Sequence, residues 1–478
     1  MTRQLPRALR PFRSSDYRIL ALAMAVSLFG SGMWAVAMVY EVIELGGDEI
    51  ALSLVGTATA VGLITTAVLG GIAADRLPRR WILRGVELLN VIAVGSSAIL
   101  SAIGLVEVWH LAVTGAMLGA ATGFFFPAYS AILPSILPED ELLAANGLEG
   151  MGRPVLMQAA GPALAGTITA AISPGTAIMW IALCHVIAFV SLFRLHPRVD
   201  EGKPAAPDVV GLATTTSPRT CPIPIAHAQE ADPGAAAEAE AGVRSAADAL
   251  SAADTAESNS TAAAGATTTV WQDLVEAVRF TVRTPWLAWT LAWSCLIVFV
   301  YVGPFEVLTP FLLRDRLGLG SDSFGLVLAA FGVGAAVGSL IMASGRLPRR
   351  YLTLMLMSWG LPLGLFAAFG LATELWHLIV IAVIVGATGG IGGVIWGTLL
   401  QRRVPRHMLG RVSSLDFFVS LAFMPLSMAL VGPVAKAVPI EWIFIGVGAI
   451  SVVSTIVVWL AGRFTADEIA HPLDVEGS

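Results

Sequence analysis

The sequence has little charge. Only 13% of its 478 residues are Asp, Glu, Lys or Arg, whereas a soluble domain carries roughly 25%. Hydrophobic residues make up 56% of the chain, and the mean hydropathy is +0.78. Because so few charges cannot cover a water-facing surface, we expect most of the surface to face the hydrocarbon of a lipid bilayer.

Cysteine is also scarce. The three cysteines, Cys184, Cys221 and Cys295, show neither disulfide nor metal-ligand spacing. The sequence contains no nucleophile–base constellation, no phosphate-binding loop and no basic patch typical of nucleic-acid binding. We therefore predict that the protein is not an enzyme and uses no cofactor, no metal and no nucleic-acid partner.

The chain instead contains long apolar runs. A spanning helix needs about 20 mainly apolar residues, because the hydrocarbon core is about 30 Å thick. We count twelve such runs, at 19–43, 50–73, 83–105, 109–135, 146–171, 175–194, 286–312, 322–345, 351–372, 376–399, 413–436 and 440–462. Only helices satisfy their backbone hydrogen bonds in lipid over such lengths. The sequence predicts an all-α polytopic membrane protein with twelve transmembrane helices.

The placement of arginine predicts the orientation of these helices, because cytoplasmic loops are enriched in Lys and Arg. Cations gather in the N-terminal arm and after the second, eighth and tenth runs, as Arg3, Arg7, Arg10, Arg13, Arg18, Arg76, Arg79, Arg80, Arg84, Arg346, Arg349, Arg350, Arg402, Arg403, Arg406 and Arg411. The alternate loops carry few cations, namely Arg314, Arg316 and Lys436. Both termini are predicted to be cytoplasmic.

Residues 199–270 differ in composition from the rest of the chain. They are rich in Ala, Thr, Ser, Pro and Glu and contain almost no aromatic residues, so they cannot bury enough apolar surface to become ordered. We predict a disordered cytoplasmic linker between a bundle at 1–198 and a second at 271–478. Apolar residues within 271–285 recur at helical spacing and predict an amphipathic helix at the membrane surface.

The two halves of the chain repeat each other. Residues 76–80 (RLPRR) recur as 346–350, and residues 107–111 (EVWHL) as 374–378 (ELWHL). The second offset also places Gly119 on Gly386. Pro154, Gly161 and Pro162 recur as Pro425, Gly432 and Pro433. A duplicated six-helix unit predicts two pseudo-symmetric bundles with a site near the membrane midplane between them.

The loop at 71–80 (GIAADRLPRR) resembles the signature loop of the major facilitator superfamily. The resemblance implies a loop that gates the cytoplasmic side by latching the two halves together, through Gly71, Asp75, Arg76, Arg79 and Arg80. Asp75 suits this role, because a carboxylate can cap a helix N-terminus or pair with arginine. A basic loop that only fixes topology would explain the arginines but not Asp75.

Two further motifs resemble one part of this superfamily. Residues 161–166 (GPALAG), with Gly161, Pro162 and Gly166, resemble a motif of its antiporters, although small residues also serve simple helix packing. Residues 398–405 (TLLQRRVP) resemble a bacterial exporter branch that includes the enterobactin exporter and macrolide and multidrug efflux proteins. The resemblance implies an inner-membrane transporter, which we expect to be a monomer. Residues 111–137 contain no charged residue, whereas many proton-coupled drug exporters carry an arginine inside this fourth helix, so their coupling mechanism does not transfer directly.

Charged residues within the apolar runs are candidate functional residues, because they are costly in lipid. Glu306 follows Gly303 and Pro304, which we expect to break the helix near a transport site. Glu41 lies in a similar context in the first helix, so both carboxylates are predicted to face one cavity and to bind protons. Alternatively, both are solvated at the headgroup level.

Four other polar residues have two interpretations. Glu149 and Arg153 lie four residues apart, so they share a helix face and form either part of the proton and substrate site or a structural ion pair. Asp416 is predicted to begin the eleventh helix and to belong to the cytoplasmic gate. His185 is either a proton carrier or a buried histidine bonded to a neighbouring helix.

We predict a secondary active transporter that exports small amphipathic organic compounds, such as drugs, macrolide-like metabolites or siderophores, in exchange for protons. The alternatives are an importer or lysophospholipid flippase of the same fold, and a membrane sensor that transports nothing. A transport assay separates them, because the direction of solute movement distinguishes export from import and a sensor moves no solute.

Deleting residues 205–265 is expected to leave transport largely intact, because the predicted linker contributes no apolar surface to either bundle. Efflux by a deletion variant that reaches the membrane checks this expectation, and abolished efflux would contradict it.

Overall fold

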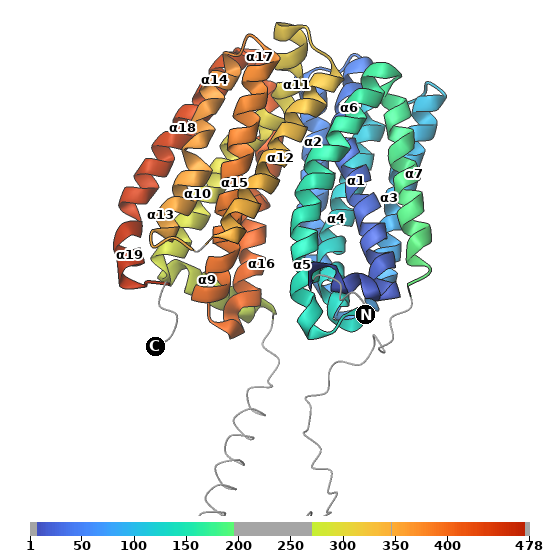
Figure 1. Ribbon diagram of the computed structural model, residues 1–478. Coiled ribbons are helices and arrows are strands. Elements are labelled where there is room, and N and C mark those ends of the chain that lie inside the picture. The colour runs from blue at the N-terminus through green and yellow to red at the C-terminus, as the bar shows by residue number, and fades with distance from the viewer. Residues whose placement is uncertain (1–6, 196–269, 346, 474–478) are drawn as a thin grey trace, which may run out of the picture. The chain divides into compact units, whose positions relative to one another are not determined.

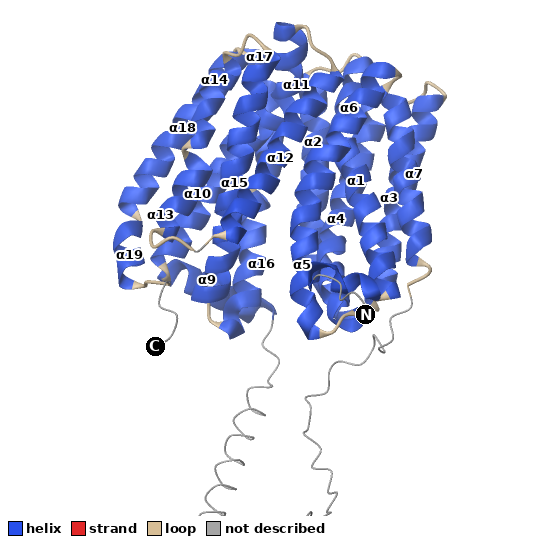
Figure 2. Cartoon of the chain, in the orientation of Figure 1, coloured by secondary structure: helices blue, strands red, loops and turns tan. Residues whose placement is uncertain are grey.

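The computed structural model describes residues 7–195, 270–345 and 347–473. All regular structure in these residues is helical, and they contain no strand (Figure 2). Most of them form one compact unit, made of residues before 203 and after 277. The predicted linker at 199–270 lies outside the described residues except for Val270.

The N-terminal half of the compact unit is built from helices that each begin where the sequence offers a start signal. Its elements are η1 (Arg7–Arg13), α1 (Ser15–Glu44), α2 (Glu49–Arg76), α3 (Arg79–Ala102), α4 (Val108–Ile136), α5 (Glu139–Arg153), η2 (Pro154–Ala160), α6 (Gly161–Ala171) and α7 (Pro174–Leu192). Asp48 caps α2 by accepting from the N–H groups of Ile50 and Ala51. Ser173 caps α7, which opens with Pro174.

The C-terminal half follows the predicted amphipathic segment, which is helical as α9 (Val270–Arg283). Its further elements are α10 (Pro285–Gly303), η3 (Pro304–Leu308), α11 (Thr309–Phe311), η4 (Leu312–Arg316), α12 (Ser321–Ser344), α13 (Tyr351–Gly360), η5 (Pro362–Leu365), α14 (Phe366–Gly370), α15 (Leu375–Arg403), α16 (Arg406–Ala422), α17 (Met424–Ala437), α18 (Ile440–Ala461) and α19 (Phe464–Ala470).

The helices pack into two bundles that follow the two halves of the chain (Figure 1). In the N-terminal bundle α2 packs on α4, and α7 packs on α1 and α3. In the C-terminal bundle α12 packs on α15, α10 on α17, and α14 on α18. The bundles meet where α17 contacts α2 and where α12 contacts α6 and η2. Helix α1 begins and α18 ends at the same end of the bundles, which we call the terminal end (Figure 1).

Eleven of the described helical segments are long and apolar enough to span a membrane. They coincide with the predicted spans except the fifth, 146–171. There the chain stays helical from Glu139 to Ala171, but the π-helical segment η2 interrupts the α-helix. Pro154 begins η2, and its missing N–H removes one i→i−4 hydrogen bond, which favours a wider turn.

The predicted repeat is visible in matching contacts. A Cβ on Gly119 would collide with the carbonyl oxygen of Thr59, and one on Gly386 would collide with that of Phe331. Each glycine therefore lets the fourth helix of its half approach the second closely. Trp109 Nε1 donates to Glu107 over 2.8 Å, and Trp376 Nε1 donates to Glu374 over 2.7 Å. Both halves thus begin this helix in the same way.

The outer surface of the bundles is apolar, as a lipid-facing surface must be. Large aliphatic side chains on the spanning helices, such as Ile99 (64% exposed), Leu340 (61%) and Leu460 (62%), are exposed. Monomers in water rarely expose large contiguous apolar surfaces. With eleven candidate spans, these exposed side chains identify a multi-pass membrane protein.

Candidate functional site

A cavity of about 350 Å³ lies between the two bundles. Helices α1, α2 and α6 and the segment η2 line it from the N-terminal bundle, and α10, η3, α12 and α17 line it from the C-terminal bundle. Its volume falls within the range of small-molecule sites, about 300–1,000 Å³. The position between the halves is where the repeat predicts a transport site.

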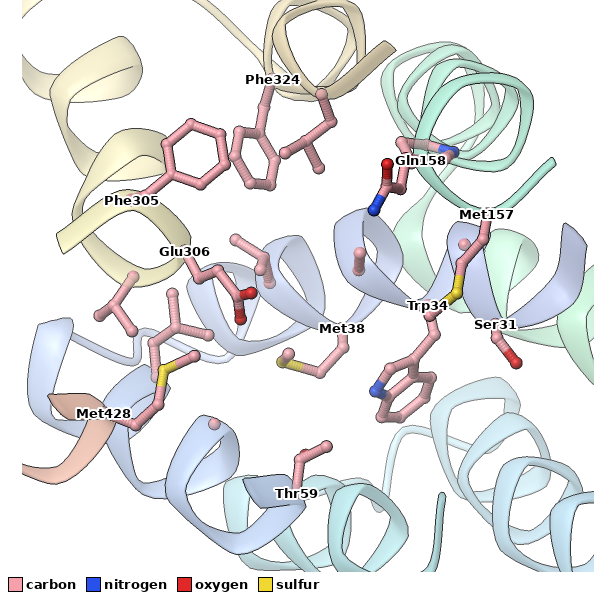
Figure 3. A pocket seen from close by; sticks show the side chains of 18 of the residues that line it. Ser31, Trp34, Met38, Thr59, Met157, Gln158, Phe305, Glu306, Phe324 and Met428 are labelled. Carbon is pink, nitrogen blue, oxygen red and sulfur yellow. The ribbon is translucent and has the colours of Figure 1, made fainter. Parts of the chain in front are cut away.

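The cavity wall is largely apolar and contains a single charged residue among the described residues, Glu306. The Glu306 carboxylate points into the cavity, whose wall also includes Trp34, Met38, Phe324 and Met428 (Figure 3). The side chain of Glu306 is exposed to this space, not packed into protein. The other polar groups of the wall include Ser31, Thr59, Gln158 and Tyr301. A lone carboxylate among aromatic and thioether groups suits an amphipathic cation.

Two π-helical segments, one from each bundle, supply residues of this wall. The segment η2 contributes Met157 and Gln158, and η3 contributes Phe305 and Glu306. We expected Pro304 to break its helix, but the helix continues with a widened turn. The reason is that the missing N–H of proline removes one hydrogen bond without ending the helix. Such π turns occur frequently at functional sites.

The end of the cavity opposite the terminal end is closed by contacts between the bundles. The Ser53 hydroxyl of α2 donates to the carbonyl oxygen of Met428 over 2.7 Å, and the Gly432 N–H donates to the Ser53 oxygen over 2.9 Å. On the other side of the cavity, the Ser321 hydroxyl of α12 donates to the Gly166 carbonyl over 3.1 Å. These bonds join α2 to α17 and α6 to α12.

Charged groups cover this closed end. Lys436 Nζ lies 3.1 Å from both Asp48 Oδ2 and Glu49 Oε2 across the bundle interface. The pKa of Asp48 is held below its usual value, first because the Ala51 N–H donates to the carboxylate and then because Lys436 is bound to it. With a lowered folded pKa, the stabilisation by Asp48 is present at neutral pH and is lost as the pH falls through that pKa.

Glycines make the closure tight. An ideal Cβ on Gly166 would lie 2.5 Å from the carbonyl oxygen of Ser321, and one on Gly325 would lie 2.5 Å from that of Pro162. A Cβ on Gly161 would lie 2.7 Å from the carbonyl oxygen of Phe29 in α1. The motif at 161–166 thus packs α6 against α1 on one side and against the other bundle on the other.

This architecture agrees with the sequence comparison. The profile of the Major Facilitator Superfamily matches residues 20–424 and 313–475. The chain belongs to the major facilitator superfamily.

Curated relatives of this major facilitator are exporters by name. It is 25% identical over 428 residues to the multidrug efflux pump Tap of Mycolicibacterium fortuitum, covering 87% of this chain and 88% of that protein. It is 30% identical over 127 residues to the macrolide efflux protein A of Streptococcus pyogenes, covering 26% of this chain and 30% of that protein. It is 29% identical over 178 residues to the enterobactin exporter EntS of Shigella flexneri, covering 35% of this chain and 40% of that protein.

Solved structures of other transporters share the fold. A POT family transporter in complex with a thioalcohol-conjugated peptide aligns with a TM-score of 0.63 at 14% identity, covering 94% of this chain and 97% of that one. The nucleoside transporter NupG aligns with a TM-score of 0.58 at 11% identity, covering 94% and 99%. At these identities the likeness shows the fold alone.

The structure does not bring the two predicted carboxylates together. Glu306 lies in the cavity wall, but Glu41 is buried inside the N-terminal bundle, at 4% exposure. There Ser101 of α3 hydrogen-bonds to it, and Gly175 of α7 lies beside it. The similarity of the sequence around Glu41 and Glu306 could not show this, because their helices turn different faces to the cavity.

The other predicted polar residues lie away from the cavity wall. Arg153 Nη2 contacts Glu149 Oε1 over 2.7 Å, so these two form the predicted ion pair within α5. Asp416 does not begin its helix, because α16 already begins at Arg406 after Pro405. Its carboxylate instead accepts from Trp396 Nε1 over 2.9 Å and from the Ser420 hydroxyl over 3.1 Å, within the C-terminal bundle.

The predicted gating loop is described only in part. The side chains of Gly71, Asp75 and Arg76 lie outside the described part of the structure. Arg79 and Arg80 open α3 at the terminal end and are half-buried. The gating role of the loop therefore stays a prediction.

Several residues of the cavity wall are absent from the predicted site. Trp34, Met38, Gln158 and Met428 belong to apolar runs in which no sequence signal separates cavity-facing from lipid-facing positions. Among the described residues, no group of His, Cys, Asp or Glu could hold a metal ion.

Replacing Ser53 by alanine is expected to weaken the closed end. The change removes the donor to Met428 and the acceptor of the Gly432 N–H, and an unpaired buried group costs about 1–3 kcal/mol. Spin labels at positions 45 and 438, one in each bundle, should then show a larger population of long distances by pulsed dipolar spectroscopy. Thr65→Ala is the control, because Thr65 bonds only carbonyls of its own helix in the described structure. An unchanged distance distribution in Ser53→Ala would contradict the closure.

Proposed function

We propose that this protein is a proton-driven exporter of small amphipathic organic cations. The observation that carries the proposal is the cavity between the bundles, with one carboxylate, Glu306, in a largely apolar wall. A negative charge in a low-dielectric cavity attracts a cation far more strongly than in water. The apolar wall accommodates the hydrophobic part of the same molecule. An anionic siderophore fits this wall less well.

The relatives support export as the direction. The multidrug efflux pump Tap matches over most of both chains, and the macrolide and enterobactin exporters match over parts. The peptide and nucleoside transporters among the solved structures share the fold only and say nothing about direction.

Proton coupling follows from competition at one carboxylate. Glu306 can hold either a proton or a substrate cation, but not both, because each neutralises the same charge. An exchanger results if the proton binds from outside and the substrate displaces it from inside. The protein then alternates between states open to either side, as the two halves rock about the cavity.

We infer the orientation from the arginine-rich loops, which place the terminal end in the cytoplasm of a bacterial cell. The closed end with Ser53 and Lys436 then faces outside. At the cytoplasmic side, Asp75 and Arg76, with Arg79, Arg80 and Asp416, would form the opposing gate. We propose that the protein works as a monomer, because the cavity is complete within one chain.

Efflux from cells tests the function. Energised cells expressing the protein are loaded with ethidium, with erythromycin or with the anionic siderophore enterobactin, and efflux is followed with and without a protonophore. The expected result is protonophore-sensitive efflux of ethidium. Uptake driven by the proton gradient would indicate an importer. If no probe moved in either direction, the result would contradict export and favour a sensor that transports nothing.

A further inference from the structure

A buried cluster of polar residues lies inside the N-terminal bundle, away from the cavity wall. His185 Nδ1 of α7 is 3.0 Å from Glu87 Oε2 of α3, and the Ser27 hydroxyl of α1 donates to Glu87 Oε1 over 2.6 Å. His185 is 0% exposed, Glu87 1% and Ser27 6%. Three helices therefore meet at one carboxylate in the interior of a membrane protein, where ionisable groups are rare and functional by default.

The hydrogen bonds of this cluster are incomplete. His185 Nε2 has no hydrogen-bond partner among the described residues, nor has Oδ1 of Asn90, which lies one turn after Glu87 and is 6% exposed. Gly30 of α1 packs closely on α7 beside the ring, because an ideal Cβ there would lie 3.0 Å from Cys184 Cβ and 3.6 Å from His185 Nε2. A cluster that only held helices together would be expected to use these buried polar atoms.

Other ionisable groups lie on the helices around the pair, and α1 carries Asp16, Arg18, Glu41 and Glu44 near its two ends. Arg84 precedes Glu87 by one turn and donates to the carbonyl oxygens of Leu192, Phe193 and Leu195 at the end of α7. Cys184 is the neighbour of His185 in α7. Tyr17 of α1 and Tyr129 of α4 belong to the same buried hydrophobic cluster as Val86 and Ala188, which are close to Glu87 and His185 in the sequence.

Helix α1 links the cluster to the cavity. Ser27 contacts Glu87, and one to two turns later Ser31 and Trp34 line the cavity from the same helix. The hydroxyl that binds Glu87 and two residues of the cavity wall therefore belong to one continuous helix, α1.

We propose that the Glu87–His185 pair is a second proton-binding site, separate from Glu306, so that two protons are exchanged for each monovalent cation. This inference rests on the proposed function, because a second proton has a role only in a proton-driven exporter.

The chemistry needs no further reactant. In the proton-free state that we propose, Glu87 is a carboxylate that only accepts hydrogen bonds, so the proton of His185 is on Nδ1 and Nε2 keeps a free lone pair. The pair then has a charge of −1. A proton from the outer water binds the Nε2 lone pair and forms an imidazolium beside the carboxylate, with net charge zero. Release of that proton to the cytoplasm restores the first state.

The net charge moved in each cycle tests the proposal. The full-length protein is reconstituted into liposomes, ethidium exchange is driven by a pH gradient, and a membrane potential is imposed with potassium and valinomycin. Exchange of two protons for one ethidium moves one net charge, so in the wild type 100 mV should change the accumulation ratio by up to about 50-fold. Protein-free liposomes correct for passive ethidium entry.

The variants Glu87→Gln and His185→Gln are expected to keep pH-driven exchange through Glu306 and to lose the response to potential. If a single variant misfolds, the double variant with both Glu87→Gln and His185→Gln is tested in its place, because the two amide side chains can hydrogen-bond to each other. Ser97→Ala, which removes the buried Ser97–Thr114 hydrogen bond of 2.7 Å without touching an ionisable group, should behave as wild type. A wild type without a potential response, or variants that retain one, would overturn the second site. A wild type that moves no ethidium at all would overturn the proposed function instead.

Discussion

Replacing Glu306 by glutamine is expected to weaken ethidium binding by about ten- to hundredfold and to abolish its proton-driven export. A hydrogen bond to a charged group contributes about 1.5–3 kcal/mol, and 1.4 kcal/mol corresponds to a factor of ten. Among the described residues the cavity wall offers no second charge to replace the lost one. Fluorescence titration of the purified protein with ethidium measures the change.

Two further variants separate the loss of charge from a change of shape. Glu306→Asp keeps the charge and should retain binding within about tenfold. Met428→Leu changes the wall of the cavity without removing charge and should bind ethidium within about threefold of wild type, because volume-conserving swaps are well tolerated. Wild-type affinity in Glu306→Gln would show that the carboxylate does not bind the cation.

Replacing Gly166 by leucine is expected to reduce transport at least tenfold. The new Cβ would lie 2.5 Å from the Ser321 carbonyl oxygen and 3.2 Å from Gly325 Cα. Backbone atoms cannot move aside as a flexible side chain does, so α6 and α12 must separate and the outer end cannot close. Ethidium exchange in liposomes measures the rate.

The matched control is Gly95→Leu in the same bundle, where an ideal Cβ meets no atom within 4 Å. It should fold and transport as wild type does. Normal exchange by Gly166→Leu would mean that the contact between α6 and α12 does not have to form during the cycle.

The fold was predictable from the sequence because it depends on the length of the apolar runs and on the internal repeat, and both can be read from the sequence alone. Apolar runs of spanning length and the repeat of residues 76–80 and 107–111 predicted two bundles of similar helices, and the family assignment confirms that fold. The matching roles of Gly119 and Gly386 show that the repeat extends to individual close contacts.

The site was less predictable, because it depends on the rotation of each helix. Glu41 and Glu306 have similar sequence surroundings, yet one is buried within a bundle and the other faces the cavity. Glu87 was absent from the predicted residues, although a carboxylate inside an apolar run carries the same signal as Glu306. The partner of His185 could not be found from spacing, since the two residues are 98 positions apart.

Proton movement coupled to ethidium is the most direct test of the proposed function. Liposomes containing the protein and a trapped pH indicator are prepared with an acidic lumen, and ethidium is added outside. We predict that the lumen becomes alkaline as ethidium enters, and that Glu306→Gln shows no such change. Ethidium entry through the wild-type protein without a change in luminal pH would contradict proton-coupled exchange.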